Sequence, residues 1–223
     1  MKLVNWILAL LPYALALALA TYALPHMPAQ LPTHWGPSGE PDAWGSAAQA
    51  LYQMPMLLLP GSLLVLSIGQ FSRQDRDNAP IFFLVALGLG LLALIETAHL
   101  VFSWDSVKTS LVSLGGLFAL IGNGMGKLKP SAFAGLRTPW VYLSRRAWHA
   151  SQRRTGLWLT VYGLLLALPA LVLPREYLVP VFYPGLMTVG GLGLVGGLAY
   201  ASYLDYRKDP DPQPTNLGPR PQA

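Results

Sequence analysis

Long stretches without charge alternate with polar segments along this chain of 223 residues. A helix needs about 20 mostly apolar residues to cross a hydrocarbon core of about 30 Å. Six stretches come close to that length and hold at most one charged residue, and they span residues 6–24, 52–71, 80–104, 109–126, 155–173 and 177–204. Because lipid offers the backbone no hydrogen-bonding partner, each is predicted to be a helix. The pattern predicts an all-α integral membrane protein with six transmembrane helices.

The first stretch also has features of a cleaved signal peptide, because Ala18, Leu19 and Ala20 resemble a cleavage triplet. Its apolar run is longer than that of most signal peptides, and Lys2 is its only basic residue. We therefore interpret it as a retained transmembrane helix.

Basic residues fall on alternate sides of the six stretches. With the N-terminus in the cytoplasm, 13 of the 15 Lys and Arg residues lie in inner segments, and only Lys108 and Arg175 lie outside. Cytoplasmic segments of membrane proteins are enriched in Lys and Arg. Both termini are therefore predicted to be cytoplasmic, in a multi-pass protein of the cell membrane. The same asymmetry accounts for the net charge of +5, so that no direct nucleic-acid partner is expected.

The composition agrees with a membrane location. Hydrophobic residues make up 53% of the chain and charged residues 11%, whereas soluble domains average about 25% charged residues. This balance argues against a soluble enzyme, a disordered chain and a free nucleic-acid-binding protein. The absence of cysteine excludes a disulfide framework, a thiol nucleophile and cysteine-ligated metal sites.

Two long loops and a tail set the predicted domain organisation. An N-terminal two-helix unit (1–80) contains an outer loop (25–51) whose many Pro and Gly residues predict consecutive turns. A four-helix region (81–205) contains a basic inner loop (123–154). The Pro-rich polar tail (206–223) is predicted to be disordered in the cytoplasm. In the last predicted helix, Gly193 and Gly197 form a GxxxG pair that allows close helix packing.

The inner loop is predicted to contain one amphipathic helix. Thr138 is a suitable N-cap, and Pro139 suits the first helical position. On a helical wheel the apolar side chains from Trp140 to Ala150 share one half, and basic residues such as Arg145 occupy the other. Such a helix is expected to lie in the inner membrane interface, with its basic face toward lipid phosphates or a partner.

Two motifs resemble a known family. The inner loop reads GNGMGKLKPSAFAGLRTPW over residues 122–140, and this resembles the signature of the SdpI-like bacterial immunity proteins. The matching residues are Gly122, Asn123, Gly135, Leu136, Arg137, Thr138, Pro139, Trp140 and Trp148. The outer loop reads LPTHWGPSGEPDAWGS over residues 31–46, and it resembles the N-terminal domain of unknown function that often accompanies the signature. Its matching residues are Pro32, His34, Trp35, Gly39, Pro41, Asp42, Trp44 and Gly45. Ala47 departs from the pattern, since many relatives have a lysine there.

The resemblance implies a bacterial membrane protein that protects the cell from a secreted toxic peptide. In the namesake system the protein also holds a small helix-turn-helix repressor at the membrane. The implied partners are membrane lipids, a secreted antimicrobial peptide toxin and a cytoplasmic helix-turn-helix repressor, and no cofactor is needed. The candidate ligand- or partner-binding residues are Asn123, Arg137, Thr138, Pro139, Trp140, Arg145, Arg146 and Trp148. The candidate outer-loop residues are His34, Trp35, Glu40, Asp42 and Trp44.

Glu96 is the only charged residue inside a predicted transmembrane stretch, which makes it a candidate functional residue. His99 lies three residues further on the same helical face. With His34 from the outer loop, these two residues could bind zinc, or they could form a proton or ligand site. In the alternative without function, Glu96 is protonated or bonded to His99.

Two other functions stay open at this level. One is a metal-dependent membrane enzyme centred on His34, Glu96 and His99, although no HExxH motif is present. The other is a small transporter, which would need polar residues along several helices, whereas only Glu96 is charged there. A binding protein is therefore preferred over an enzyme.

Overall fold

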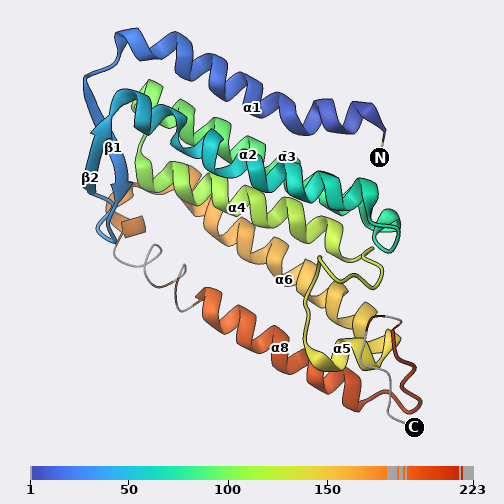
Figure 1. Cartoon of the computed structure of the whole chain (residues 1–223). Coiled ribbons are helices and arrows are strands. Elements are labelled where there is room, and N and C mark those ends of the chain that lie inside the picture. The colour runs from blue at the N-terminus through green and yellow to red at the C-terminus, as the bar shows by residue number, and fades with distance from the viewer. Residues whose placement is uncertain (1, 180–184, 186–187, 189, 216, 218–223) are drawn as a thin grey trace.

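The computed structural model describes residues 2–179, 185, 188, 190–215 and 217. Its long helices lie side by side in a bundle (Figure 1). These are α1 (Leu3–Ala23), α2 (Ala47–Phe71), α3 (Ala79–Phe102), α4 (Ser106–Met125), α6 (Arg145–Val172) and α8 (Gly191–Arg207). Both α1 and α2 pack against α3, which contacts α4, and α4 contacts α6, which contacts α8. Short helical segments are η1 (Leu24–His26), η2 (Arg76–Asn78), α5 (Pro139–Leu143) and α7 (Arg175–Tyr177).

Four helical segments in the described part of the chain are long and apolar enough to cross a membrane. They are Leu3–His26, Ala47–Phe71, Arg76–Phe102 and Arg145–Val172, and each contains most of one predicted stretch. The predicted stretch 109–126 forms α4, which is not among the four. Polar residues at both ends of α4, such as Lys108 and Asn123, leave it a short apolar centre. The last predicted stretch, 177–204, includes residues 180–184, 186–187 and 189, which lie outside the described residues.

The ends of the bundle separate the two motifs. The start of α1, the turn 72–78 and the segment 126–144 lie at one end, together with residues 208–215 (Figure 1). The strands, the turn between α3 and α4, and α7 lie at the other end. The loops that the sequence assigns to the inner and outer sides thus lie at opposite ends of the bundle.

The outer loop is a β-hairpin, and this corrects the predicted series of turns in an all-α protein. Strands β1 (Gln30–Trp35) and β2 (Pro41–Ser46) pair antiparallel, with Gln30 opposite Ser46. Proline is tolerated because both strands of a two-stranded sheet are edges, where one side of the backbone needs no partner. Gly39 has φ of +75°, a conformation that favours glycine, and it allows the tight turn between the strands.

Helices α4 and α6 make direct backbone contact through paired glycines. Gly115 faces Gly163, and Gly122 faces Gly156. A Cβ atom on Gly115 would lie 2.5 Å from the carbonyl oxygen of Gly163, and one on Gly122 would lie 2.7 Å from that of Gly156. Small residues allow such close approach of helices. Gly193 and Gly197, the pair expected from the sequence to pack closely, face open space in the described structure.

The predicted amphipathic helix is divided at Ser144. As expected, Thr138 precedes a helix with Pro139 at its start, but this helix, α5, ends at Leu143. Ser144 has extended backbone angles, and its Oγ accepts a hydrogen bond from the N–H of Ala147 (2.9 Å). This is the geometry of an N-cap, so Ser144 begins a second helix. Residues 145–154 are therefore the first turns of α6, continuous with the candidate membrane segment, and do not form a separate interfacial helix.

Candidate functional site

The inner segment, residues 126–144, connects α4 to α6 and carries the Gly-Leu-Arg-Thr-Pro-Trp motif. The side chain of Gln152, which is fully buried on α6, holds this motif. Its Nε2 donates to the carbonyl oxygen of Leu136 (3.0 Å), and its Oε1 accepts from the N–H of Leu136 (2.9 Å). Gly135 has φ of +100°, and a Cβ there would lie 2.6 Å from Gln152 Oε1. Glycine is thus required beside this pair of bonds, which we call the Gln152 clamp.

A second amide holds the other end of the inner segment. Asn78 Nδ2 donates to the carbonyl oxygen of Lys129 (3.2 Å), and Asn78 Oδ1 accepts from the N–H of Lys129 (2.9 Å). The same Nδ2 donates to the buried carboxylate of Asp75 (3.3 Å). The segment is therefore fixed at Lys129 from the start of α3 and at Leu136 from α6.

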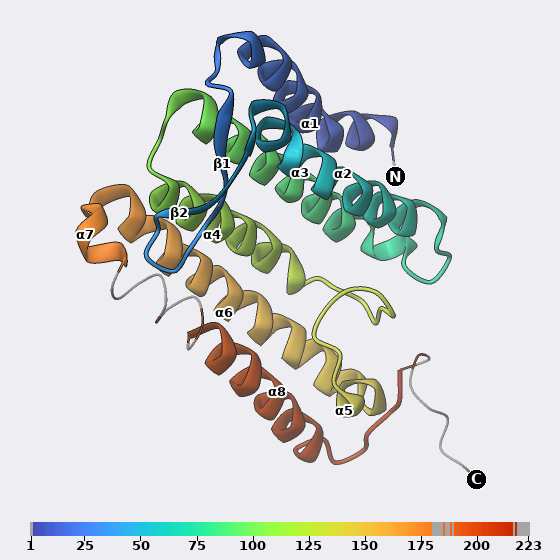
Figure 2. The same cartoon turned by 60° about the vertical axis from the view of Figure 1, so that its left-hand side comes forward.

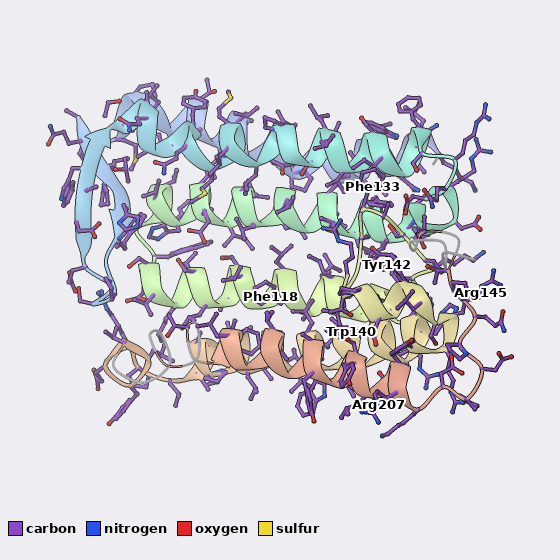
Figure 3. All side chains as sticks on the ribbon, turned by 60° about the horizontal axis from the view of Figure 1, so that its bottom comes forward. Phe118, Phe133, Trp140, Tyr142, Arg145 and Arg207 are labelled. Atoms are coloured by element: carbon purple, nitrogen blue, oxygen red, sulfur yellow. The ribbon has the colours of Figure 1, made fainter. Side chains whose placement is uncertain are left out.

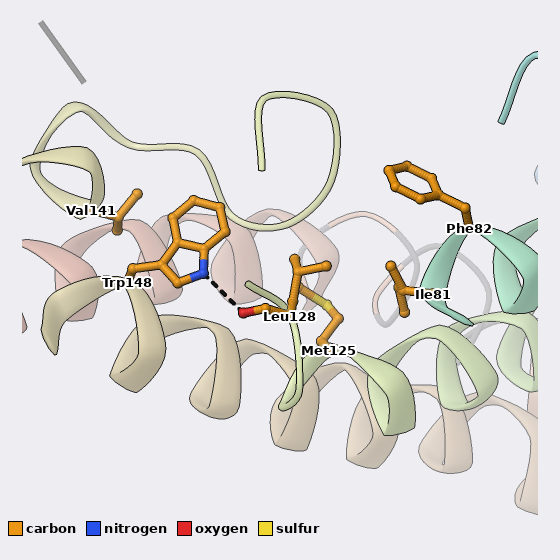
Figure 4. Close-up of a cluster of buried hydrophobic side chains, with 6 residues drawn as sticks. All are labelled: Ile81, Phe82, Met125, Leu128, Val141 and Trp148. Atoms are coloured by element: carbon orange, nitrogen blue, oxygen red, sulfur yellow. Dashed lines mark hydrogen bonds between the residues drawn. The ribbon is translucent and has the colours of Figure 1, made fainter. Parts of the chain in front are cut away.

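Trp148 lies in the core beneath the inner segment. It is fully buried and packs with Ile81, Phe82, Met125, Leu128 and Val141 (Figure 4). Its Nε1 donates to the carbonyl oxygen of Leu128 (3.0 Å). Trp148 was expected among the binding residues, but its burial makes it a core residue that supports the segment.

The residues around Trp140 join the inner segment to α8. The Nε1 of Trp140 donates to Ser202 Oγ (2.5 Å), and Thr138 Oγ1 lies within hydrogen-bond distance of the same oxygen (2.9 Å). The ring of Trp140 meets that of Tyr203 edge-on. Thr138 and Trp140 thus bind within the protein, whereas Pro139 is exposed.

The three arginines among the candidate residues of this end have exposed side chains. Arg137 Nη1 donates to the carbonyl oxygen of Ala132 (2.7 Å), while Arg145 and Arg146 extend from the first turn of α6. Figure 3 shows Arg145 at the edge of the molecule, at the same end as Trp140 and Tyr142. Asn123 is also exposed. It lines a cavity with Ile81, Lys127 and others, and none of these three arginines is among the lining residues.

Tyr142 forms part of the seat for the C-terminal tail. Burial raises the pKa of Tyr142, and its hydroxyl donates to the carbonyl oxygen of Ser131 (3.3 Å). Its own carbonyl accepts from the N–H of Thr215 (2.8 Å) and from Thr215 Oγ1 (3.0 Å). The N–H of Arg145 donates to the carbonyl oxygen of Gln213 (2.9 Å). The sequence predicts disorder from residue 206, whereas α8 continues to Arg207 and the tail bonds to the inner segment as far as Thr215.

At the opposite end, the hairpin reaches across α4 toward α6 and α7 (Figure 2). Arg175 on α7 holds its turn, since Nη2 donates to the carbonyl oxygen of Gly39 (2.9 Å) and pairs with Glu40 Oε1 (2.7 Å). Nη1 of Arg175 lies 3.5 Å from Asp105 Oδ2, and Ser106 Oγ also donates to Gly39 (3.3 Å). The hairpin thus links α1 and α2, which flank it in the chain, to α4 and α7.

The other candidate residues of the outer loop lie along the two strands. His34 Nδ1 pairs with Asp42 Oδ1 (2.5 Å), and both side chains are exposed. Trp44 is 59% exposed, as suits a membrane interface. Trp35 is half-buried, and its ring centroid lies 5.1 Å from that of His99.

Replacement of Arg175 tests the attachment of the hairpin. We expect Arg175→Ala to raise amide hydrogen exchange in residues 36–42 by about tenfold, because charged hydrogen bonds contribute about 1.5 kcal/mol or more. Lys108→Ala removes the other outer base without touching the hairpin and should leave exchange unchanged. Equal exchange in the wild type and Arg175→Ala would show that Arg175 does not hold the turn.

Glu96 and His99 line a small cavity beneath the hairpin. This cavity of about 20 Å³ is also lined by Thr97, Trp35 and Gln53, among others. Ser113 Oγ donates to Glu96 Oε1 (2.7 Å). His99 Nδ1 donates to the carbonyl oxygen of Trp104 (3.0 Å), while its buried Nε2 has no partner among the described residues.

The candidate zinc ligands are not brought together. His34 is paired with Asp42 and does not line the cavity of Glu96 and His99. Across the described residues, no group of three His, Asp or Glu side chains is placed to hold a metal ion. The hydrogen bond of Glu96 goes to α4, and the alternative bond between Glu96 and His99 is not the one formed.

Several residues that shape these sites were missed from the sequence. Gln152, Asn78 and Ser202 are ordinary polar residues whose partners lie far along the chain. Arg154 and Asp205 form a two-bond ion pair between α6 and α8 that the sequence also does not reveal (2.6 and 3.0 Å). The sequence does contain a signal for the importance of Arg175, because it is one of only two basic residues assigned to the outer side.

Comparison with known families supports both motifs. Residues 127–201 match the SdpI/YfhL protein family, and residues 11–59 match a domain of unknown function, DUF1648. The first region extends from the inner segment through α6 and α7 into α8, and the second covers the hairpin with parts of α1 and α2. No curated protein and no solved structure matches the chain. The chain therefore carries an N-terminal DUF1648 domain followed by an SdpI/YfhL family domain, as the resemblance of its two motifs indicates.

Proposed function

We propose that this protein is an immunity protein of the bacterial cell membrane, which protects the cell from a secreted, cationic, membrane-active peptide. The observation that carries this proposal is the position of the hairpin. Its strands begin and end at α1 and α2, while its turn is held by Arg175 and Ser106 beside α4 and α6. A peptide that displaces the hairpin therefore acts on both halves of the bundle at once.

The charge at the hairpin end suits a cationic peptide. Glu40, Asp42, Asp105 and Glu176 outnumber the two basic residues there, Lys108 and Arg175. Complementary charge speeds the encounter of binding partners. Exposed Trp44 adds an aromatic surface for an apolar peptide.

The inner end suits a second partner. Movement of α4 relative to α6 is transmitted to the inner segment, because the segment connects the two helices and the Gln152 clamp fixes it to α6. The exposed Arg137 and Arg146 then present positive charge to an acidic surface of a cytoplasmic helix-turn-helix repressor. In this scheme the protein holds the repressor at the membrane and makes no direct contact with nucleic acid.

Expression in a sensitive bacterium tests the proposal. Cells that make the protein should survive higher concentrations of at least one secreted cationic peptide than cells that make none. Asp42→Lys should remove most of this protection, since it reverses a charge on the hairpin. Asp211→Lys makes the same change at the opposite end and serves as the control, with membrane insertion measured for both variants.

The possible results of this experiment test separate parts of the proposal. Unchanged sensitivity to the whole peptide panel would contradict the immunity function. Full protection by Asp42→Lys would remove the hairpin from peptide recognition. A reporter gene under repressor control that stays silent when peptide is added would contradict the signalling step alone.

A further inference from the structure

A pocket at the inner end, separate from the cavity that Asn123 lines, brings hydrogen-bond donors together from four parts of the chain. Its volume is about 390 Å³. Gln74 from the α2–α3 turn, Lys129 from the inner segment, Arg145 and His149 from α6, and Thr215 from the tail line it, with Pro130 and Leu217. No carboxylate is among these lining residues.

The cations of this pocket are only weakly neutralised. Lys129 Nζ pairs with Asp77 Oδ2 (2.7 Å), but both side chains are more than 60% exposed. Exposed ion pairs of this kind contribute little binding energy. Arg145 is exposed and forms no ion pair with any residue that the structure describes. The pocket therefore holds positive charge that a ligand can neutralise.

We propose that this pocket binds a phosphate group, as presented by the headgroup of an anionic phospholipid. Arginine binds phosphate oxygens with two parallel hydrogen bonds, and lysine adds a compact charge. Arg145, Arg146, Arg153 and Arg154 precede the charge-free stretch of α6 that begins at Thr155. Basic residues next to a membrane segment attract anionic lipid headgroups. The non-polar parts of Pro130 and Leu217 offer contacts for the glycerol beneath the phosphate.

A phosphate in this position bridges the inner segment, the start of α6 and the tail. Lys129 lies at the first fixed end of the inner segment, and Arg145 lies at the start of α6. Thr215 lines the same pocket and bonds to Tyr142. Bound lipid is therefore expected to stabilise the docking of the tail on the inner segment.

Thermal unfolding of the purified full-length protein in a neutral detergent measures this binding. Short-chain phosphatidylglycerol should raise Tm in a saturable manner, whereas short-chain phosphatidylcholine, whose headgroup has no net charge, should not. The double variant Arg145→Gln/Lys129→Gln should need at least about tenfold more phosphatidylglycerol for the same shift, because each charged hydrogen bond contributes about a factor of ten in affinity. Arg207→Gln removes a positive charge from α8 at the same end and should titrate like the wild type.

Titration with inorganic phosphate distinguishes a lipid headgroup from a soluble phosphate as the source of the bound group. A shift with phosphatidylglycerol and none with inorganic phosphate supports the lipid headgroup. A saturable shift with inorganic phosphate that the double variant loses supports the phosphate site but assigns it to a soluble phosphate. Equal titration curves for the wild type and the double variant would overturn the proposal, provided that the variant without ligand has the Tm of the wild type.

Discussion

Gly163→Val is expected to lower the free energy of unfolding by about 3 kcal/mol or more. A side chain at this position would meet the carbonyl oxygen of Gly115 and the backbone nitrogen of Ala119, 2.6 Å from its Cβ. Because these atoms belong to the backbone of α4, the clash is relieved only if the two helices separate. For a chain of this length the change corresponds to about 10 °C in Tm, which can be measured by thermal unfolding in detergent.

Gly116→Val is the matched control for this prediction. Gly116 is the neighbour of Gly115 on α4, and a Cβ there meets nothing within 4 Å. The control should stay within a few degrees of the wild type. If both variants unfold alike, helix propensity explains the loss, and the contact between α4 and α6 does not.

Gln152→Leu is expected to cost about 2 to 4 kcal/mol, because it leaves the N–H and C=O of the half-buried Leu136 without their partner on the buried face of α6. The leucine has nearly the same volume, so packing changes little. Variant protein that still inserts should lose protection against the peptide, since the Gly-Leu-Arg-Thr-Pro-Trp motif loses its fixed conformation.

Arg153→Leu provides the control for the Gln152 clamp. It introduces the same side chain at the next residue of α6, where the arginine is exposed. Thermal unfolding and the cell-protection assay should both give values near those of the wild type. Wild-type protection by Gln152→Leu would show that the motif works without the clamp.

The sequence predicts the helices well because lipid imposes a simple rule. Charge-free stretches mark where helices lie, and four of the six correspond to segments that can cross a membrane. The ends of the helices are predicted less accurately, since α6 begins at Arg145, ten residues before the stretch that predicted it. Ser144 sets the start of α6, because its side chain caps the first turn of that helix. This local preference outweighs the amphipathic pattern, which continues through Ser144 in the sequence.

The site is less predictable than the helices because it depends on contacts between distant residues. The resemblance singles out Arg137, Thr138 and Trp140, but not the residues that hold them. Gln152 and Ser202 look like unremarkable polar residues of a helix until the fold places them against the motif. The hairpin was missed for a different reason, since proline and glycine favour turns in the sequence and are also tolerated in a two-stranded edge sheet.

The amide side chains of Asn78 and Gln152 hold the two ends of the stretch between Lys129 and Leu136. Asn78 fixes Lys129, and Gln152 fixes Leu136, so the residues in between form a loop whose two ends are already secured. Phe133 stands 53% exposed at the outside of this loop. A short epitope inserted beside Phe133 should therefore be accepted without unfolding, and antibody access to it in intact and opened cells would report which side of the membrane this end of the protein faces.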